Sequence, residues 1–397
     1  MKICILGWYG TETIGDRAIL GGIISFFGEV LKVDKLEIKI GALYPFYSER
    51  MKSEDLGFFE KISKKSIDIE LFNSKIKKEL EKAIEKSYFI IFGGGPMMHI
   101  EPLYMIEYGF EYAKRLKKKT GIIGCGIGPL FYEEYKKSAV NILKKSDIII
   151  LRDKKSKENL VEILDEFNLH ESLDINKIKV SFDPAVKCAM EYMKYAKYEN
   201  KNEIVINLRS FPSEYSNDLN KVEIINKNLR NFINKLSILY KEDKILLLPM
   251  HYFSIGGDDR VFLNELKFKE NLSYNVKVQN EILTLEETMN KFFNAKYCIG
   301  MRFHSVVLQT ILSQKNFILD YTEKNKGKIS GFIEDIDNNF SFYSKRYINL
   351  QDEVKIDVSD FVINTDDLFN YDKNAVIMRL KIYNEEIRRV MDENFTY

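Results

Sequence analysis

The stretch from Gly300 to His304 holds two side chains that suit an anionic substrate. Arg302 offers a planar guanidinium that can grip a carboxylate or a phosphate, and His304 offers an imidazole that titrates near neutral pH. An apolar run at 295–299 predicts a buried strand before them, and helical spacing of apolar residues follows. Both side chains then stand at a strand's carboxyl end and a helix start, where open α/β sheets bind ligands. The alternative is a surface ion pair and a packing histidine.

Three more polar side chains follow apolar runs in the second half of the chain. They are Arg209, His251 and Lys328, and each comes after a predicted strand. Because the carboxyl ends of parallel strands meet at one edge of a sheet, we expect them to converge with Arg302 and His304 on one cleft wall. Such a cationic pocket is hard to explain as a solvated face in a nearly neutral protein.

Glycine-rich turns follow the predicted strands of the first half. They allow the backbone to approach a ligand closely, and the single tryptophan among them predicts stacking on a sugar ring. Tight packing, helix capping and an exposed loop histidine are the alternatives. The glycines have neither dinucleotide-binding nor Walker spacing, so NAD and ATP are not expected. The candidate binding residues here are Gly7, Trp8, Asp16, Gly94, Gly95 and His99.

Composition and charge narrow the class of protein. The 397 residues suffice for two domains, and 60 basic against 59 acidic residues leave no global field that attracts nucleic acid. Four scattered cysteines without metal-ligand spacing are typical of reduced thiols, and no apolar run approaches the ~18 residues of a membrane span. We therefore predict a cytoplasmic protein. The basic cluster at 114–119 is interpreted as a solvated helix end, with docking to the inner face of the membrane as the alternative.

Strand-like runs alternate with amphipathic helical stretches along the chain, which is typical of parallel sheets covered on both faces. The alternation breaks at 189–202, which we interpret as a linker or an inter-domain helix. We predict two Rossmann-like, doubly wound domains at 1–190 and 203–397, the second ending in an amphipathic helix at 375–393. With a site in the cleft, this is the GT-B-like arrangement of many glycosyltransferases.

The order of the motifs resembles that of the polysaccharide pyruvyl transferases. Each motif is weak by itself, but the ordered set is specific and extends over about residues 1–335. Arg17, where an acidic residue is expected, and the loop at 8–13 depart from the family pattern. The segments that carry the resemblance are 7–20, 92–95, 126–130, 152–156, 183–185, 207–209, 251–259, 300–304 and 328–332.

This resemblance implies a reaction and a division of roles. Pyruvate would pass from phosphoenolpyruvate to two hydroxyls of a sugar, in a cell-surface glycan or its lipid-linked precursor, leaving a cyclic ketal and phosphate. Arg209 and Arg302 would bind the donor's two anionic groups, and His304 would protonate its methylene carbon. The second domain would hold the donor, and the first would hold the sugar. No cofactor and no nucleic acid are expected.

Some assignments stay open at the level of sequence. The base for the sugar hydroxyl is not evident, and His99, Asp16 and Glu12 are the candidates. No metal is expected, and the pair Asp258-Asp259 is interpreted as an exposed helix start. The main alternative function is a GT-B glycosyltransferase that uses a nucleotide sugar. A non-catalytic glycan-binding protein is the third class.

Overall fold

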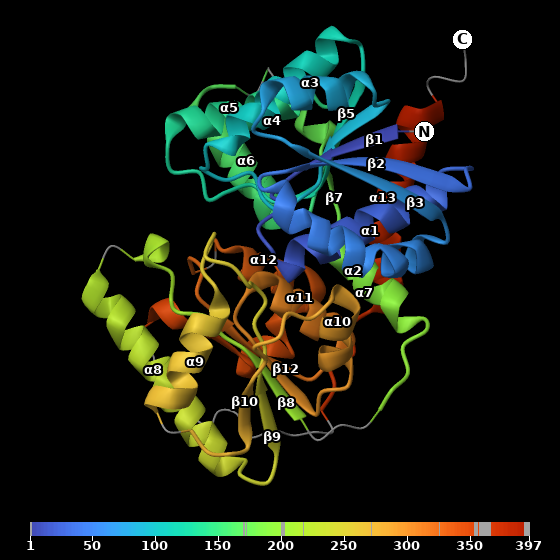
Figure 1. Cartoon of the computed structure of the whole chain (residues 1–397). Coiled ribbons are helices and arrows are strands. Elements are labelled where there is room, and N and C mark those ends of the chain that lie inside the picture. The colour runs from blue at the N-terminus through green and yellow to red at the C-terminus, as the bar shows by residue number, and fades with distance from the viewer. Residues whose placement is uncertain are drawn as a thin grey trace. The chain divides into compact units, whose positions relative to one another are not determined.

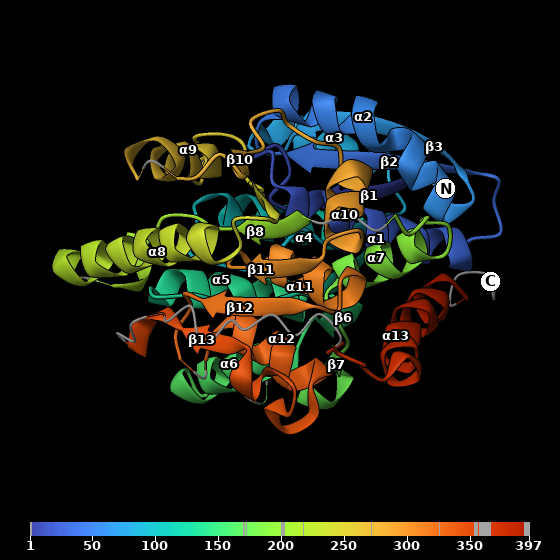
Figure 2. The same cartoon turned by 90° about the horizontal axis from the view of Figure 1, so that it is seen from below.

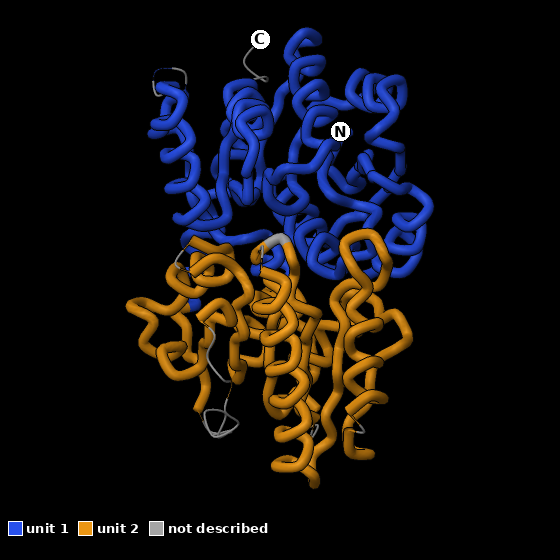
Figure 3. The backbone as a smooth tube through the Cα atoms, turned by 90° about the vertical axis from the view of Figure 1, so that its left-hand side faces the viewer, with its two compact units in different colours: residues 1–188, 373–397 blue, residues 189–372 orange. Residues whose placement is uncertain are grey.

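The alternating pattern of the sequence folds into two parallel sheets in the computed structural model of the chain (Figure 1). Contacts divide the chain into unit 1, residues 1–188 and 373–397, and unit 2, residues 189–372 (Figure 3). The two doubly wound units confirm the predicted fold class. The structure describes residues 2–169, 171, 173–199, 203–216, 218–270, 272–324, 326–352, 356 and 367–392.

The sheet of unit 1 is parallel throughout and has the strand order β3-β2-β1-β4-β5-β6-β7. Its strands are β1 (Lys2–Leu6), β2 (Lys35–Ala42), β3 (Ser66–Asn73), β4 (Phe89–Phe92), β5 (Lys119–Cys125), β6 (Ile148–Leu151) and β7 (Lys179–Val180). Its helices are α1 (Ile14–Val30), α2 (Pro45–Ser63), α3 (Lys77–Glu85), α4 (Pro102–Arg115), α5 (Glu133–Lys144), α6 (Lys154–Glu166) and α13 (Lys373–Asp392).

The sheet of unit 2 repeats this plan with the order β10-β9-β8-β11-β12-β13, and Figure 2 shows β8, β11, β12 and β13 side by side. Its strands are β8 (Glu203–Asn207), β9 (Lys244–Leu247), β10 (Val276–Val278), β11 (Tyr297–Gly300), β12 (Asn316–Asp320) and β13 (Tyr347–Asn349). Its helices are α8 (Leu219–Leu239), α9 (Asp259–Lys269), α10 (Leu285–Phe293), α11 (Phe303–Leu312) and α12 (Lys328–Ile336).

The strand order reverses once in each sheet. The reversal lies between β1 and β4 in unit 1 and between β8 and β11 in unit 2. Ligands of doubly wound sheets bind at this switch point, outside the carboxyl ends of the strands. The turn at Gly7 and the triple glycine flank the first switch point, whereas Arg209 and Arg302 flank the second.

Helix α13 belongs to unit 1, so the prediction that placed it in the second domain is wrong. The Tyr383 ring stacks on Phe26 of α1 with centroids 4.3 Å apart, and its hydroxyl donates to the Phe182 carbonyl at 2.6 Å. Arg379 donates to the Ser181 carbonyl. The apolar face of α13 therefore has its partners in unit 1. Residue 393, the predicted end of this helix, lies outside the described residues.

The predicted linker at 189–202 is in part helical. Helix α7 (Pro184–Met193) continues from unit 1 into the start of unit 2. Residues 200–202 lie outside the described residues. Within the described ranges, no helix is both long and apolar enough to cross a membrane.

Candidate functional site

Arg302 is held by a buried carboxylate. It follows β11 as the N-cap of α11, and its Nε lies 2.8 Å from each carboxylate oxygen of Asp259 while Nη2 lies 2.6 Å from Oδ1. The Asp259 side chain is fully buried, which corrects its interpretation as an exposed helix start. Its Oδ2 also accepts from the backbone N–H groups of Met250 and His251. One carboxylate thus fixes both Arg302 and the turn after β9.

His251 lies in that turn as a neutral imidazole. Burial is the main cause that lowers the pKa of His251 to about 4, and the Arg302 and Arg209 guanidiniums lower it further against the opposing effect of Asp259. A Cβ on Gly256 would lie 2.7 Å from its Cε1, so the loop after β9 packs directly on the ring. His251 therefore joins the cluster as a hydrogen-bonding group and adds no positive charge to it at neutral pH.

Tyr321, which the sequence did not single out, lies among the cations. The Arg209 guanidinium and the Lys328 ammonium each lie 5.8 Å from its ring centroid. Burial alone would raise the pKa of Tyr321, but Lys328, Arg209 and Arg302 outweigh burial and lower it. The phenol oxygen therefore lies in a positive electrostatic potential. Its place directly after β12, at the ligand edge of the sheet, was the available signal.

Lys328 is positioned by a tight approach of two turns. It is the first residue of α12, and a Cβ on the preceding Gly327 would lie 1.8 Å from Oγ1 of Thr322. Only glycine allows this contact, which brings the start of α12 against the end of β12. A lysine at a helix N-terminus opposes the helix dipole. Its position there therefore does not add to the stability of the helix.

Asp320, at the end of β12, is fully buried beside this lysine. Burial raises its pKa to about 6, although the hydroxyls of Thr322 and Tyr347 donate to the carboxylate and Lys328 acts in the same stabilising direction. Asp320 thus carries less negative charge near neutral pH than an exposed aspartate. It reduces the positive field of the cluster only in part.

The structure therefore brings together Arg209, His251, Arg302 and Lys328 at the carboxyl edge of the unit 2 sheet. Asp259 pairs with Arg302 and Asp320 is partly protonated near pH 6, so the cluster keeps a net positive charge. His304 lies in the first turn of α11, partly exposed, with its ring against Phe303 at 4.9 Å between centroids. It stands two residues from Arg302. Its catalytic role stays a prediction.

The glycine turns of unit 1 pack against each other. A Cβ on Gly7 would lie 2.7 Å from the Gly94 Cα, and the Trp8 N–H donates to the Gly94 carbonyl. A Cβ on Gly95 would meet the Trp8 ring at 2.8 Å. The tight-packing alternative thus explains these glycines, and their predicted backbone contact with a ligand has no support in this geometry.

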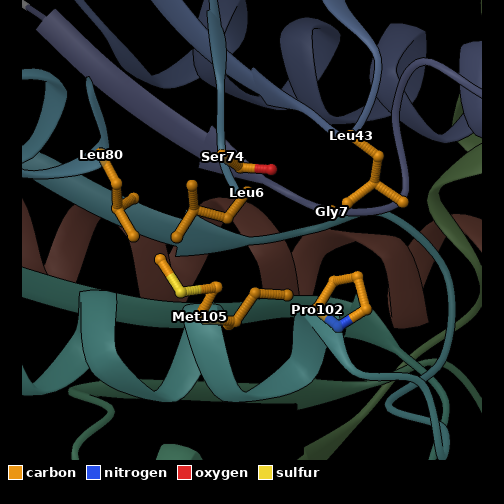
Figure 4. A pocket seen from close by; sticks show the side chains of 8 residues that line it. Leu6, Gly7, Leu43, Ser74, Leu80, Pro102 and Met105 are labelled. Atoms are coloured by element: carbon orange, nitrogen blue, oxygen red, sulfur yellow. The ribbon is translucent and has the colours of Figure 1, made fainter. Parts of the chain in front are cut away.

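Trp8 is a core residue in this structure. Its side chain is buried, its ring meets Phe92 edge-on, and its indole N–H donates to the Pro96 carbonyl at 2.7 Å. The indole faces are covered, so the prediction that Trp8 stacks on a sugar is wrong for this arrangement. A pocket lined by the preceding residue, Gly7 (Figure 4), encloses about 10 Å³, room for one water molecule. The side chains that line it include Leu6, Leu43, Ser74, Leu80, Pro102 and Met105.

The opening loop of unit 1 also carries a buried ion-pair network. Arg17 donates to Glu12 at 2.5 Å and to Asp55 of α2 at 3.1 Å. Glu12 is therefore engaged in a salt bridge, which argues against it as the base. Helix α1 begins at Ile14, so Asp16 lies in its first turn and the alternative that Asp16 caps this helix does not hold.

His99 lies at the carboxyl edge of the unit 1 sheet, in the loop after β4. Its Nδ1 is 3.0 Å from the Pro129 carbonyl oxygen, and its ring lies beside those of Phe131 and Tyr132. Its side chain is partly exposed. Among the described residues, no group of three or more histidine, cysteine or acidic side chains could hold a metal ion.

These features define a two-unit α/β protein of the GT-B type with a cationic site at the switch point of its second sheet. The sequence profile of the polysaccharide pyruvyl transferase family matches residues 14–323, and the chain therefore belongs to that family. None of the curated proteins compared with the chain matches it.

Solved structures similar to the chain share its fold at low sequence identity. A UDP-GlcNAc 2-epimerase from Methanocaldococcus jannaschii has a TM-score of 0.61 and 16% identity, over 99% of this chain and 100% of that one. The S. aureus protein MnaA, solved with UDP, has a TM-score of 0.54 and 15% sequence identity, over 97% of each chain. A glycosyltransferase from Rickettsia africae has a TM-score of 0.50 and 13% sequence identity, over 98% of each chain.

Proposed function

We propose that this protein transfers pyruvate from phosphoenolpyruvate to two hydroxyls of a sugar in a cell-surface glycan or its precursor, forming a cyclic ketal and releasing phosphate. The observation that carries the proposal is the set of three cations around Tyr321 at the switch point of unit 2. Phosphoenolpyruvate carries a carboxylate and a phosphate close together. Two guanidiniums and an ammonium match both groups in charge and in hydrogen-bond geometry.

The pairing of Arg302 with Asp259 orients one donor group. Three hydrogen bonds to the carboxylate and one from Nη2 to the Gly257 carbonyl fix the plane of the guanidinium. A fixed guanidinium loses little entropy when it binds an anion, which favours binding through preorganisation. Arg209 and Lys328, both half-buried, would supply the charge that the Asp259 carboxylate removes from Arg302.

The chemical step requires a proton and a stabilised leaving group. The methylene carbon of the donor takes a proton, each sugar hydroxyl forms a bond to the neighbouring carbon and loses its proton, and the bond from that carbon to the phosphate oxygen breaks. His304 is the proposed general acid, because it is the titratable group nearest in sequence to Arg302 and lies partly exposed at the helix start. The cations stabilise the departing phosphate.

Phosphate release with phosphoenolpyruvate and a panel of glycan acceptors tests the function. Acceptor-dependent release is expected, and it should persist in a metal chelator because the cations already match the donor's charge. Arg209→Ala should weaken phosphoenolpyruvate binding at least about tenfold, the loss expected for a charge-assisted pair of ~1.5–3 kcal/mol. Turnover of a nucleotide sugar, with none of phosphoenolpyruvate, would instead establish the glycosyltransferase alternative.

A further inference from the structure

A group of aromatic rings lies open on unit 1, at the carboxyl edge of its sheet. The loop after β4 contributes one ring, the loop after β5 contributes two, and the first turns of α4 and α5 contribute one each. Tyr104, Phe131 and Tyr132 are 40%, 58% and 60% exposed. We call this group the aromatic platform; its members are His99, Tyr104, Phe131, Tyr132 and Tyr135.

The platform is continuous, with His99 at its centre. The His99 ring centroid lies 4.5 Å from that of Phe131, 6.2 Å from that of Tyr132 and 6.4 Å from that of Tyr135. Tyr135 in turn stacks on Tyr104 at 4.9 Å. Exposed aromatic surface of this extent is uncommon on a protein that does not bind something there.

The backbone beneath the platform is rigid. Met97 donates to the Gly126 carbonyl at 2.9 Å and accepts from the Gly128 N–H at 2.8 Å, so the two loops pair like short strands. The Asn159 amide donates to the Ile127 carbonyl. Such a surface is preorganised, because its loops need no ordering when a ligand binds.

The central histidine has a defined tautomer. Its Nδ1 lies 3.0 Å from the Pro129 carbonyl oxygen, which can only accept, so Nδ1 carries the proton. The Nε2 of neutral His99 then bears a lone pair. A hydroxyl group above the platform could donate to it, while the phenol groups of the tyrosines offer further hydrogen bonds.

We propose that the aromatic platform is the subsite for the acceptor sugar, with C–H faces of the sugar stacked on Phe131 and Tyr132 and one hydroxyl donating to Nε2 of His99. This inference rests on the proposed function, since it takes the acceptor to be a sugar. Aromatic faces combined with a few fixed polar atoms suit a ring that is apolar on one face and carries hydroxyls at its edge.

The charges nearby favour a neutral ligand. Glu134 lies in the first turn of α5, exposed, and acts electrostatically on Tyr104, whereas its neighbour Glu133 forms an ion pair with Lys137. The Glu134 carboxylate beside the rings repels the anionic donor and an anionic lipid surface. The platform thus complements the cationic site of unit 2, which has the opposite chemical character.

The test compares two matched pairs of substitutions. Phe131→Ser/Tyr132→Ser removes the exposed rings of the platform. Phe268→Ser/Tyr274→Ser is the control, because these rings are 74% and 85% exposed in unit 2, next to the amino end of β10. Folding of both variants is checked by their melting temperatures, which should stay close to that of the wild type because all four side chains are exposed.

Binding is measured by saturation-transfer difference NMR with methyl glycosides of galactose, glucose, mannose and N-acetylmannosamine, without phosphoenolpyruvate. At least one glycoside should bind the wild type and the control, with affinity at least about fivefold lower in the platform variant. His99→Asn, whose amide can still donate to the Pro129 carbonyl but does not reach the position of Nε2, should also bind more weakly.

Phosphoenolpyruvate affinity, measured by calorimetry in the same proteins, should not change. Absence of glycoside binding to the wild type, or equal binding by the platform variant, overturns the subsite while leaving the donor site standing. Failure of the wild type to bind phosphoenolpyruvate counts against the proposed function instead. Loss of binding to phosphatidylglycerol vesicles in the platform variant, with glycoside binding intact, would make the platform a membrane contact and overturn the inference.

Discussion

Removal of Arg302 should destabilise unit 2 as well as weaken donor binding. The guanidinium is the partner of Asp259, whose side chain has no exposure. Without it, the carboxylate would remain buried with only the backbone N–H groups of Met250 and His251 as donors. Removing one member of a buried pair costs about 3–5 kcal/mol. At ~2–4 °C per kcal/mol for a domain of this size, Arg302→Ala should lower the Tm by roughly 6–20 °C.

Calorimetric unfolding of four proteins measures this effect: wild type, Arg302→Ala, Asp259→Ala and the double variant. The double variant should lose less stability than the sum of the single variants, because it leaves no unpaired charge. Arg209→Ala is the matched control, a half-buried cation of the same cluster whose loss should affect donor binding more than Tm. If Arg302→Ala had the same Tm as the wild type, the reasoning from the buried pair would be refuted.

Three further outcomes are expected. His304→Gln should lower turnover by ~10²–10⁴ in a phosphate-release assay with little change in phosphoenolpyruvate affinity, and near-normal turnover would make His304 a packing residue. The pKa of His251 is lowered to about 4 by burial and by Arg302 and Arg209, so the unfolded chain binds its proton first and stability falls as the pH drops from about 6.5 to 4. Over that pH range, the free energy of unfolding measured in urea should therefore fall by up to about 3 kcal/mol less in His251→Asn than in the wild type. Tyr321→Phe should remove the tyrosinate absorbance that appears earliest as the pH rises, because the three cations lower the pKa of Tyr321; an unchanged titration would contradict its placement among them.

Much of the fold was predictable because several central strands, among them β4 and β6, are unbroken apolar runs. The runs at 148–151 and 297–300 are buried along their whole length, as expected for parallel strands covered on both faces. The convergence of Arg209, Arg302 and Lys328 followed from the same rule, since each comes after a strand or begins the next helix. Periodicity and chain order were sufficient for these features.

Features that depend on buried charge could not be predicted. The sequence pattern did not indicate helix α2, because Asp55 occupies a core position on its buried face, where a periodic pattern requires an apolar residue. Asp55 is tolerated there because Arg17 of α1 reaches it, a contact that spacing in the sequence does not reveal. The burial of Asp259 could not be predicted for the same reason, because its partner Arg302 lies in the turn after a different strand. Trp8 lies in a glycine-rich loop, yet the fold covers its ring.

The place of α13 in unit 1 has a consequence for how the chain folds as it is synthesised. Phe26 of α1 receives its stacking partner, Tyr383, only after all of unit 2 has been made. At ~5–20 residues per second, that delay is about 10–40 s, long compared with the folding time of a small domain. Throughout this interval the apolar surface of α1 that Tyr383 will cover is exposed. Nascent unit 1 is thus an incomplete domain, and a chaperone that binds exposed aromatic surface would find its substrate there.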